Sequence, residues 1–161
     1  MDEILEILSQ DARRSPEDIA RSTGKSAAAV RKAISDYEKK GVIVSYKAVI
    51  NHDFLRDSKP FVLALIEVSI TPQKDVGFDS IAERIYKFPE VKTCYLVSGG
   101  YDLLVVVEGA SIQTVAEFVA SKLSPMENVR QTTTHFLLKK YKEDGHILKK
   151  AKQLKRLNIS Y

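Results

Sequence analysis

A short basic helix carries the residues of this sequence that are best suited to binding another molecule. Several small or basic residues between 26 and 35 fall away from an apolar stripe formed by Val30, Ile34 and Tyr37. Small side chains at a helix start permit close approach to DNA bases, and Arg31 and Lys32 can donate to guanine acceptors or phosphates. The candidate DNA-binding residues are Ser26, Ala27, Ala28, Arg31, Lys32, Ser35 and, in the segment that follows, Lys47.

The surrounding sequence predicts the elements that would position this helix. Ser15 is a good N-cap and Pro16 suits a first helical position, while Gly24 is placed to end that helix. Ser26 then caps the basic helix and Gly41 ends it. With a short helix at residues 4–8, this predicts a helix-turn-helix unit. The alternative is an ordinary surface helix with a solvated polar side, but the turn and the paired caps favour DNA binding.

Residues 42–50, VIVSYKAVI, are rich in β-forming residues and predict a short hairpin, or wing, beside the helices. Residues 1–50 are therefore expected to form a winged helix-turn-helix DNA-binding domain. The polar stretch 51–60, which contains Pro60, is expected to be a linker.

The second half of the sequence has a different pattern. Apolar or β-rich runs predict strands at 61–70, 91–97, 102–108 and 129–138, with helices at about 79–88 and 111–123. This βαββαβ order predicts a ferredoxin-like domain over residues 61–140 and an α+β fold overall. Because the first strand is apolar on both faces, the sheet face without helices should be covered by a second copy. A homodimer would also place two recognition helices about 34 Å apart.

The C-terminal residues 141–161 predict a basic amphipathic helix. Apolar residues recur there every three or four positions, with lysines between them. Residues 139–161 hold eight Lys or Arg against two Asp or Glu, which accounts for the chain's positive excess. Whether this helix packs on its own dimer, on a neighbour or on DNA stays open, and packing on protein is preferred.

Several classes of protein fit the sequence poorly. No apolar run is long enough to span a membrane, and the acidic start MDEILEIL is unlike a signal peptide, so a cytoplasmic location is the default. Cys94 is the only cysteine, which excludes an intrachain disulfide and a thiolate zinc cluster. His52, His135 and His146 lack metal-ligand spacing. Without a nucleophile or phosphate-loop motif, we expect neither an enzyme, a metal site nor a cofactor.

Both halves together resemble one family. The segments DARRSPEDIARSTGKSAAAVRKAISDYEKKGVI, PEVKTCYLVSGGYDLLV and SPMENVRQTTTHFLL are similar, in order and spacing, to the Lrp/AsnC, or feast/famine, transcription regulators. The resemblance covers Ile4 to Leu138. It implies a winged helix-turn-helix joined to a ferredoxin-like, ligand-sensing and dimerisation domain. It also implies further assembly into octamers or discs, with amino acids bound between dimers.

The resemblance also places an effector site. The positions similar to the family's effector residues are Ser98, Gly99, Gly100, Tyr101 and Asp102, and hydroxyls of Thr132, Thr133 and Thr134 are of the kind that fix an amino acid. Backbone N–H groups of a Gly-Gly turn can bind a carboxylate, and Asp102 can pair with an α-ammonium. The alternative is a plain hairpin turn with Asp102 as its local partner. The sequence departs from the family at Gly100, where Asp is typical, and at Ala33, where Arg is common.

The sequence thus predicts an oligomeric, sequence-specific DNA-binding transcriptional regulator of the Lrp/AsnC type, bound to double-stranded DNA and modulated by an amino acid or related metabolite. The alternative is a metabolic ligand sensor or protein-interaction module without specific DNA binding. The near-neutral balance of residues 1–50, nine Lys or Arg against eight Asp or Glu, leaves that alternative open.

Overall fold

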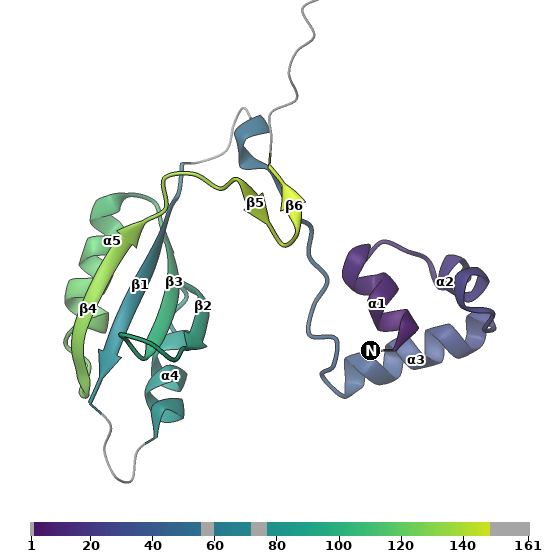
Figure 1. The fold of residues 1–161 in the computed structure, drawn as a ribbon, viewed down its shortest axis with the longest axis horizontal. Helices are drawn as coiled ribbons and strands as arrows, with labels where there is room; N and C mark the ends of the chain where they lie inside the picture. The colour runs from purple at the N-terminus through teal and green to yellow at the C-terminus, as the bar shows by residue number, and fades with distance from the viewer. Residues whose placement is uncertain (1, 56–59, 72–76, 149–161) are drawn as a thin grey trace, which may run out of the picture. The chain divides into compact units, whose positions relative to one another are not determined.

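The computed structural model describes residues 2–55, 60–71 and 77–148. The chain divides into two compact units, Met1–Ile50 and Asn51–Tyr161. The first is helical and the second is built on a β-sheet (Figure 1). Over the described ranges, no helix is both long and apolar enough to cross a bilayer.

Three helices make up the first unit: α1 (Glu3–Gln10), α2 (Pro16–Thr23) and α3 (Ala27–Lys39). Each begins where a side-chain oxygen accepts a backbone N–H: Asp2 from Ile4, Ser15 from Asp18 and Ser26 from Ala29. These bonds satisfy N–H groups that have no partner within the helix. The predicted helix starts at Ser15 and Ser26 are confirmed.

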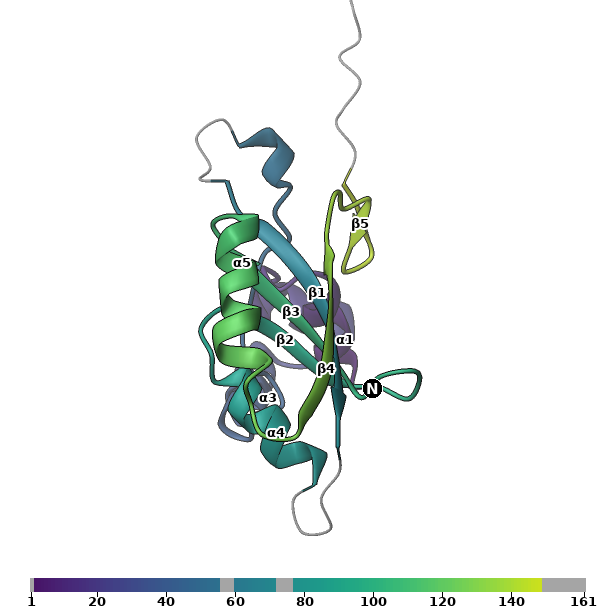
Figure 2. The same ribbon diagram turned by 90° about the vertical axis from the view of Figure 1, so that its left-hand side faces the viewer.

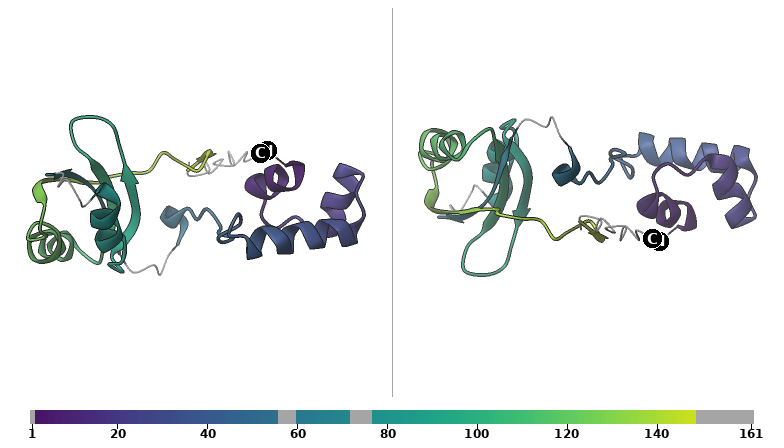
Figure 3. Two further views of the ribbon diagram at one scale, coloured as in Figure 1. Left: turned by 90° about the horizontal axis from the view of Figure 1, so that it is seen from below. Right: turned by 90° about the horizontal axis from the view of Figure 1, so that it is seen from above.

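The core of the first unit lies where the three helices meet. α1 and α2 lie against the same side of α3 (Figure 3). The buried side chains are Ile4, Leu8, Ile19, Ala20 and Val30. Because α2 and α3 share this core, their relative orientation is fixed by packing as well as by the turn between them.

A glycine in the left-handed conformation follows each of the helices α2 and α3. Gly24 ends α2 with a φ of 66°, a left-handed conformation that costs glycine nothing. Gly41 follows α3 with a φ of 68°. There Val42 N donates to Tyr37 O and Gly41 N to Glu38 O, the paired bonds of a Schellman motif.

Residues 42–50 differ from the expected hairpin, because no strand is assigned to them. Val44 is 89% exposed, and Tyr46 instead returns to α3, where its hydroxyl donates to Glu38 Oε1 at 3.0 Å. A β-rich segment becomes a strand only when another strand accepts its backbone bonds. Among the described residues no strand pairs with this segment, so it is irregular.

The second unit has the predicted βαββαβ order. Its elements are β1 (Val62–Ile70), α4 (Phe78–Tyr86), β2 (Val91–Leu96), β3 (Leu103–Gly109), α5 (Ile112–Phe118) and β4 (Val129–Phe136). A short 3-10 turn, His52–Phe54, precedes β1, and a π-helical turn, Val119–Leu123, continues α5. The sheet order is β2-β3-β1-β4 with all pairs antiparallel. The ferredoxin-like prediction is confirmed.

Both helices lie behind the sheet in Figure 1, and Figure 2 shows the sheet nearly edge-on with α5 along one side. Alternate residues of the two central strands form the core beneath the helices: Ala64, Ile66, Val68, Leu103, Val105 and Val107. Their neighbours Leu65, Leu104 and Val106 point to the other face and are only half-buried. One sheet face of this chain is therefore packed and the other is open.

The predicted C-terminal helix is wrong for its first residues. Strands β5 (Lys142–Glu143) and β6 (His146–Ile147) form a hairpin there, and Leu148 N donates to Tyr141 O at 2.9 Å. Asp144 and Gly145 both have positive φ, 43° and 83°, as a two-residue type I′ hairpin turn requires. Asp-Gly is a strong hairpin signal, and it overrides the helical spacing of the apolar residues. Residues 149–161 of the expected helix lie outside the described residues.

Candidate functional site

The basic side of α3 is exposed along its length. Ala28, Arg31 and Lys32 are exposed and Ser35 is partly so, at spacings of three and four that place them on one face. Val30 and Ile34 of the same helix face the core. A helix held from behind in this way presents its polar face as a rigid surface.

The other candidate DNA-binding residues have different settings. Ser26 is exposed, and its hydroxyl oxygen is occupied as the α3 N-cap. Ala27 is partly buried and packs against the core, so its methyl group contributes to helix packing. Lys47 is exposed on the irregular segment after α3. The structure thus gathers Ala28, Arg31, Lys32 and Ser35 on one face of α3, whereas Lys47 lies on the irregular segment that follows.

Arg31 is joined to α2 by an ion pair. Its Nη2 donates to Oε1 of Glu17, which lies in the first turn of α2. The two side chains are 58% and 52% exposed, so water and salt have access to the pair. No signal in the sequence marks Glu17 as a functional residue, because 14 positions separate it from Arg31 and only helix packing brings the two together.

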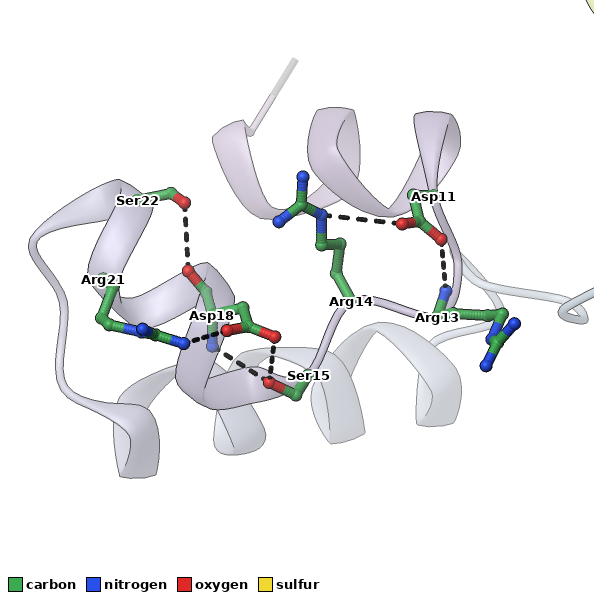
Figure 4. A network of polar contacts seen from close by, with 7 residues as sticks. All are labelled: Asp11, Arg13, Arg14, Ser15, Asp18, Arg21 and Ser22. Carbon is green, nitrogen blue, oxygen red and sulfur yellow. Dashed lines mark hydrogen bonds and ion pairs between the residues drawn. The ribbon is translucent and has the colours of Figure 1, made fainter.

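A polar network fixes the entry into α2 (Figure 4). Asp11 accepts from Arg13 N and pairs with Arg14, while Ser15 Oγ donates to Asp18 Oδ2 at 2.7 Å and accepts from Asp18 N at 3.1 Å. Arg21 also pairs with Asp18. The Ser15 hydrogen bond, and then Arg21, hold the pKa of the Asp18 carboxyl below its usual value.

The turn between α2 and α3 is tied to α1 by a second interhelical ion pair. Lys25 Nζ lies 3.0 Å from Glu3 Oε2, and both side chains are substantially exposed.

Within the described residues, Lys32 of α3 makes no such ion pair. The two cations at the centre of α3 therefore differ: Arg31 is paired with a carboxylate and Lys32 is not.

The candidate effector loop, residues 98–102, connects β2 to β3. Val97 N donates to Asp102 O, Asp102 N donates to Val68 O, and Asp102 Oδ2 accepts from Ile70 N at 2.7 Å. Ser98, Gly99 and Gly100 are exposed, and a Cβ added at either glycine would meet nothing within 4 Å. The side chain of Asp102 therefore has a structural role, but its partner Ile70 lies 32 positions away, so it is not the local partner of a hairpin turn. The two glycines leave open space at the loop tip.

The three threonines of β4 do not share a face. Thr132 and Thr134 are opposite Val68 and Ile66, on the helix-covered face, where Thr132 Oγ1 lies 3.2 Å from Ser124 Oγ. Thr133 pairs with Glu67 and points to the open face. Val68 is the neighbour of both Leu103 and Thr132, so the loop and Thr132 lie at the same end of the sheet with β1 between them. The alternation of a strand separates Thr133 from the other two.

The histidine and cysteine side chains in the described part of the chain have separate settings. No three His, Cys, Asp or Glu side chains there are arranged to hold a metal ion. His135 Nε2 lies 3.2 Å from Glu67 Oε1 on the open sheet face, and the ring of His52 packs edge-on against Phe61. Burial raises the pKa of the half-buried Cys94 thiol, which disfavours the reactive thiolate.

Comparison with known proteins matches both units. The family model for a winged helix-turn-helix DNA-binding domain matches residues 3–44, and the model for the Lrp/AsnC ligand binding domain matches residues 63–147.

Relatives match over most of the chain. The HTH-type transcriptional regulator YugG of Bacillus subtilis is 46% identical over 98% of this chain and 95% of its own length. The HTH-type transcriptional regulator LrpA of Pyrococcus horikoshii is 32% identical over 86% of this chain and 94% of its own length. A Neisseria meningitidis transcriptional regulator, solved as a complex with L-Met, has a TM-score of 0.67 at 23% identity, covering 88% of this chain and 89% of that one.

Proposed function

The chain belongs to the Lrp/AsnC family of DNA-binding transcriptional regulators, a family of regulators rather than enzymes, and from this premise we propose how its residues divide the task. α3 enters the major groove. Arg31 donates to base edges there, while Lys32 and Lys47 contact phosphates. The observation that carries this proposal is the exposed face of Ala28, Arg31, Lys32 and Ser35 on a helix whose opposite face is locked into the core.

The functional unit is a homodimer formed through the open sheet face. That face holds the half-buried Leu65, Leu104 and Val106, and Tyr95 beside them is 57% exposed. Contiguous apolar surface of this kind marks an interface. A dimer carries two α3 helices, the number needed to read two half-sites, which lie about 34 Å apart for this class of motif. Further assembly of dimers, up to an octamer, belongs to the same proposal.

An amino acid binds at the loop of residues 98–102. The open glycine tip gives a carboxylate access to backbone N–H groups, and Asp102 Oδ1 has no protein partner among the described residues, so it is available to an α-ammonium. Thr132 is a candidate contact at the same end of the sheet, Thr134 lies opposite Ile66 in the middle of β1, and Thr133 belongs to the dimer face. The L-Met complex of the Neisseria regulator supports an amino-acid effector.

The test is a selection of duplexes from a random pool by the purified protein, with gel shifts of the region upstream of its own gene. An enriched sequence with two-fold symmetry is expected. A thermal-shift screen of L-amino acids, read with light scattering, then tests the effector, because a ligand of the native state raises the melting temperature. Equal binding to all duplexes contradicts the DNA proposal. The effector proposal is contradicted if neither the melting temperature nor the particle mass changes with any amino acid.

A further inference from the structure

We propose that Glu17 is a specificity-determining residue. Its carboxylate, on α2, holds the guanidinium of Arg31 and so keeps that guanidinium from binding DNA phosphates at non-cognate sequences. This inference rests on the proposed function of α3. Glu17 itself makes no base contact in it, because it acts through Arg31.

The geometry of the two helices supports this role. Glu17 and Arg31 are anchored on helices that share the buried Ile19, Ala20 and Val30, so the bases of both side chains are fixed. Their ends meet at the surface, where both are about half exposed. An exposed ion pair of this kind changes an equilibrium by about fivefold at most, which allows exchange when DNA binds.

A phosphate and a guanine make different demands on this pair. In a helix-turn-helix complex the first helix crosses the DNA backbone while the second enters the groove. Glu17 lies in the first turn of that first helix, so a phosphate reaching for Arg31 there meets a carboxylate of the same sign. Guanine O6 and N7 are neutral acceptors. The planar guanidinium has five donors, so Arg31 can bind guanine while one nitrogen stays on Glu17.

Lys32 provides an internal contrast. Its ammonium is a point charge without an ion pair in the described part of the chain, and it is free to follow any phosphate. In this proposal Lys32 contributes general attraction to phosphates, while the adjacent Arg31 binds base edges.

The experiment compares the duplex selected by the wild-type protein with a scrambled duplex of equal length, by fluorescence anisotropy over a range of salt. The variants are Glu17→Gln, Glu17→Gln with Arg31→Ala, and Glu3→Gln. The last is the matched control, since it removes the same charge from another exposed interhelical pair in the same unit, Glu3 with Lys25. Glu17→Asp serves as a charge-retaining variant whose shorter side chain weakens the pair.

Glu17→Gln is expected to tighten binding to the scrambled duplex by about fivefold, and to steepen its log–log salt dependence by about 0.9, the value of one added phosphate contact. The selected duplex should change less, so discrimination falls. Glu3→Gln should leave discrimination unchanged, and Glu17→Asp should fall between wild type and Glu17→Gln. In the Arg31→Ala background, Glu17→Gln should no longer steepen the salt dependence.

Equal effects of Glu17→Gln and Glu3→Gln would overturn the inference, because they would show that only the loss of one negative charge matters and not its position beside Arg31. An effect that persists without Arg31 would overturn it as well. A wild-type protein that enriches no sequence contradicts the proposed function instead, so the two failures are distinguishable.

Discussion

The carboxylate of Asp102 accepts a hydrogen bond from the backbone N–H of Ile70 at 2.7 Å, which joins the β2–β3 loop to the end of β1. The register of β1 against β4 shifts between Ser69 and Ile70, so this N–H lies at an irregular point of the ladder. A side chain thus supplies a bond at the point where the sheet is irregular. The loop proposed to bind an effector is thereby held in one position on the sheet.

Replacing Asp102 separates its structural role from its proposed ligand role. Asp102→Ala leaves the partly buried Ile70 N–H without its acceptor and should lower the free energy of unfolding by about 1–3 kcal/mol. Asp102→Asn retains an acceptor oxygen and should cost less, but it removes the negative charge offered to an α-ammonium. Urea unfolding measures the first effect, and amino-acid thermal shifts measure the second. If both variants lose stability equally, the hydrogen bond is not the cause.

The adjacent cations Arg31 and Lys32 of α3 should respond differently to alanine. Arg31→Ala should weaken binding to the selected duplex by about 1–3 kcal/mol and relax the preference at one base position. Lys32→Ala should weaken selected and scrambled duplexes equally and reduce the salt slope by about 0.9. Titrations of both duplexes at several salt concentrations check this. Identical behaviour of the two variants would contradict the assignment of base and phosphate contacts.

Gly24 tests the turn between α2 and α3. Its φ of 66° is unfavourable for a residue with a Cβ, although a Cβ there would meet nothing within 4 Å. Gly24→Ala should therefore lower the free energy of unfolding by about 1–2 kcal/mol through backbone strain alone. Gly24→Asn is the control, because Asn tolerates this conformation better. Thermal or urea unfolding should rank wild type, Asn and Ala in that order, and Ala as stable as Asn would rule out strain as the cause.

Acid should weaken the α2 network. The Ser15 hydrogen bond and then Arg21 lower the pKa of Asp18 in the folded protein from its usual 3.8. A lowered folded pKa contributes stability that is present above pH 3.8 and is lost as the pH falls toward the folded value. Urea unfolding of wild type and Asp18→Asn at pH 7 and pH 3 checks this. The stability gap between the two proteins should be smaller at pH 3, and an unchanged gap would exclude the carboxylate as its source.

The open sheet face should determine the oligomeric state. Val106→Asp places a charge at the centre of that face, opposite Leu65 and Thr93, and should prevent the proposed dimer from forming because burying an unpaired charge is costly. Gln113→Glu, at an exposed position of α5, is the control. Light scattering gives the mass of each. A Val106→Asp protein of unchanged mass would place the dimer interface elsewhere.

Much of the fold was predictable because its signals act over a few residues. Helix starts are fixed by caps that bond to nearby backbone, at Ser15 and Ser26. Helix ends are marked by glycines with positive φ, at Gly24 and Gly41. The alternation of buried residues along β1 and β3 likewise reflects the period of a strand. The Asp144-Gly145 hairpin was predictable on the same grounds, and the helical interpretation of residues 141–148 gave too much weight to apolar spacing.

The sequence by itself determined which helix carries Arg31 and Lys32, and the βαββαβ order of strands and helices along the chain. Only the tertiary structure decided that Glu17 meets Arg31 and that Asp102 meets Ile70, across 14 and 32 positions. Such contacts depend on how packed helices cross and how strands are registered. Those geometries are set by the whole core at once, whereas caps and turns are set by their immediate neighbours.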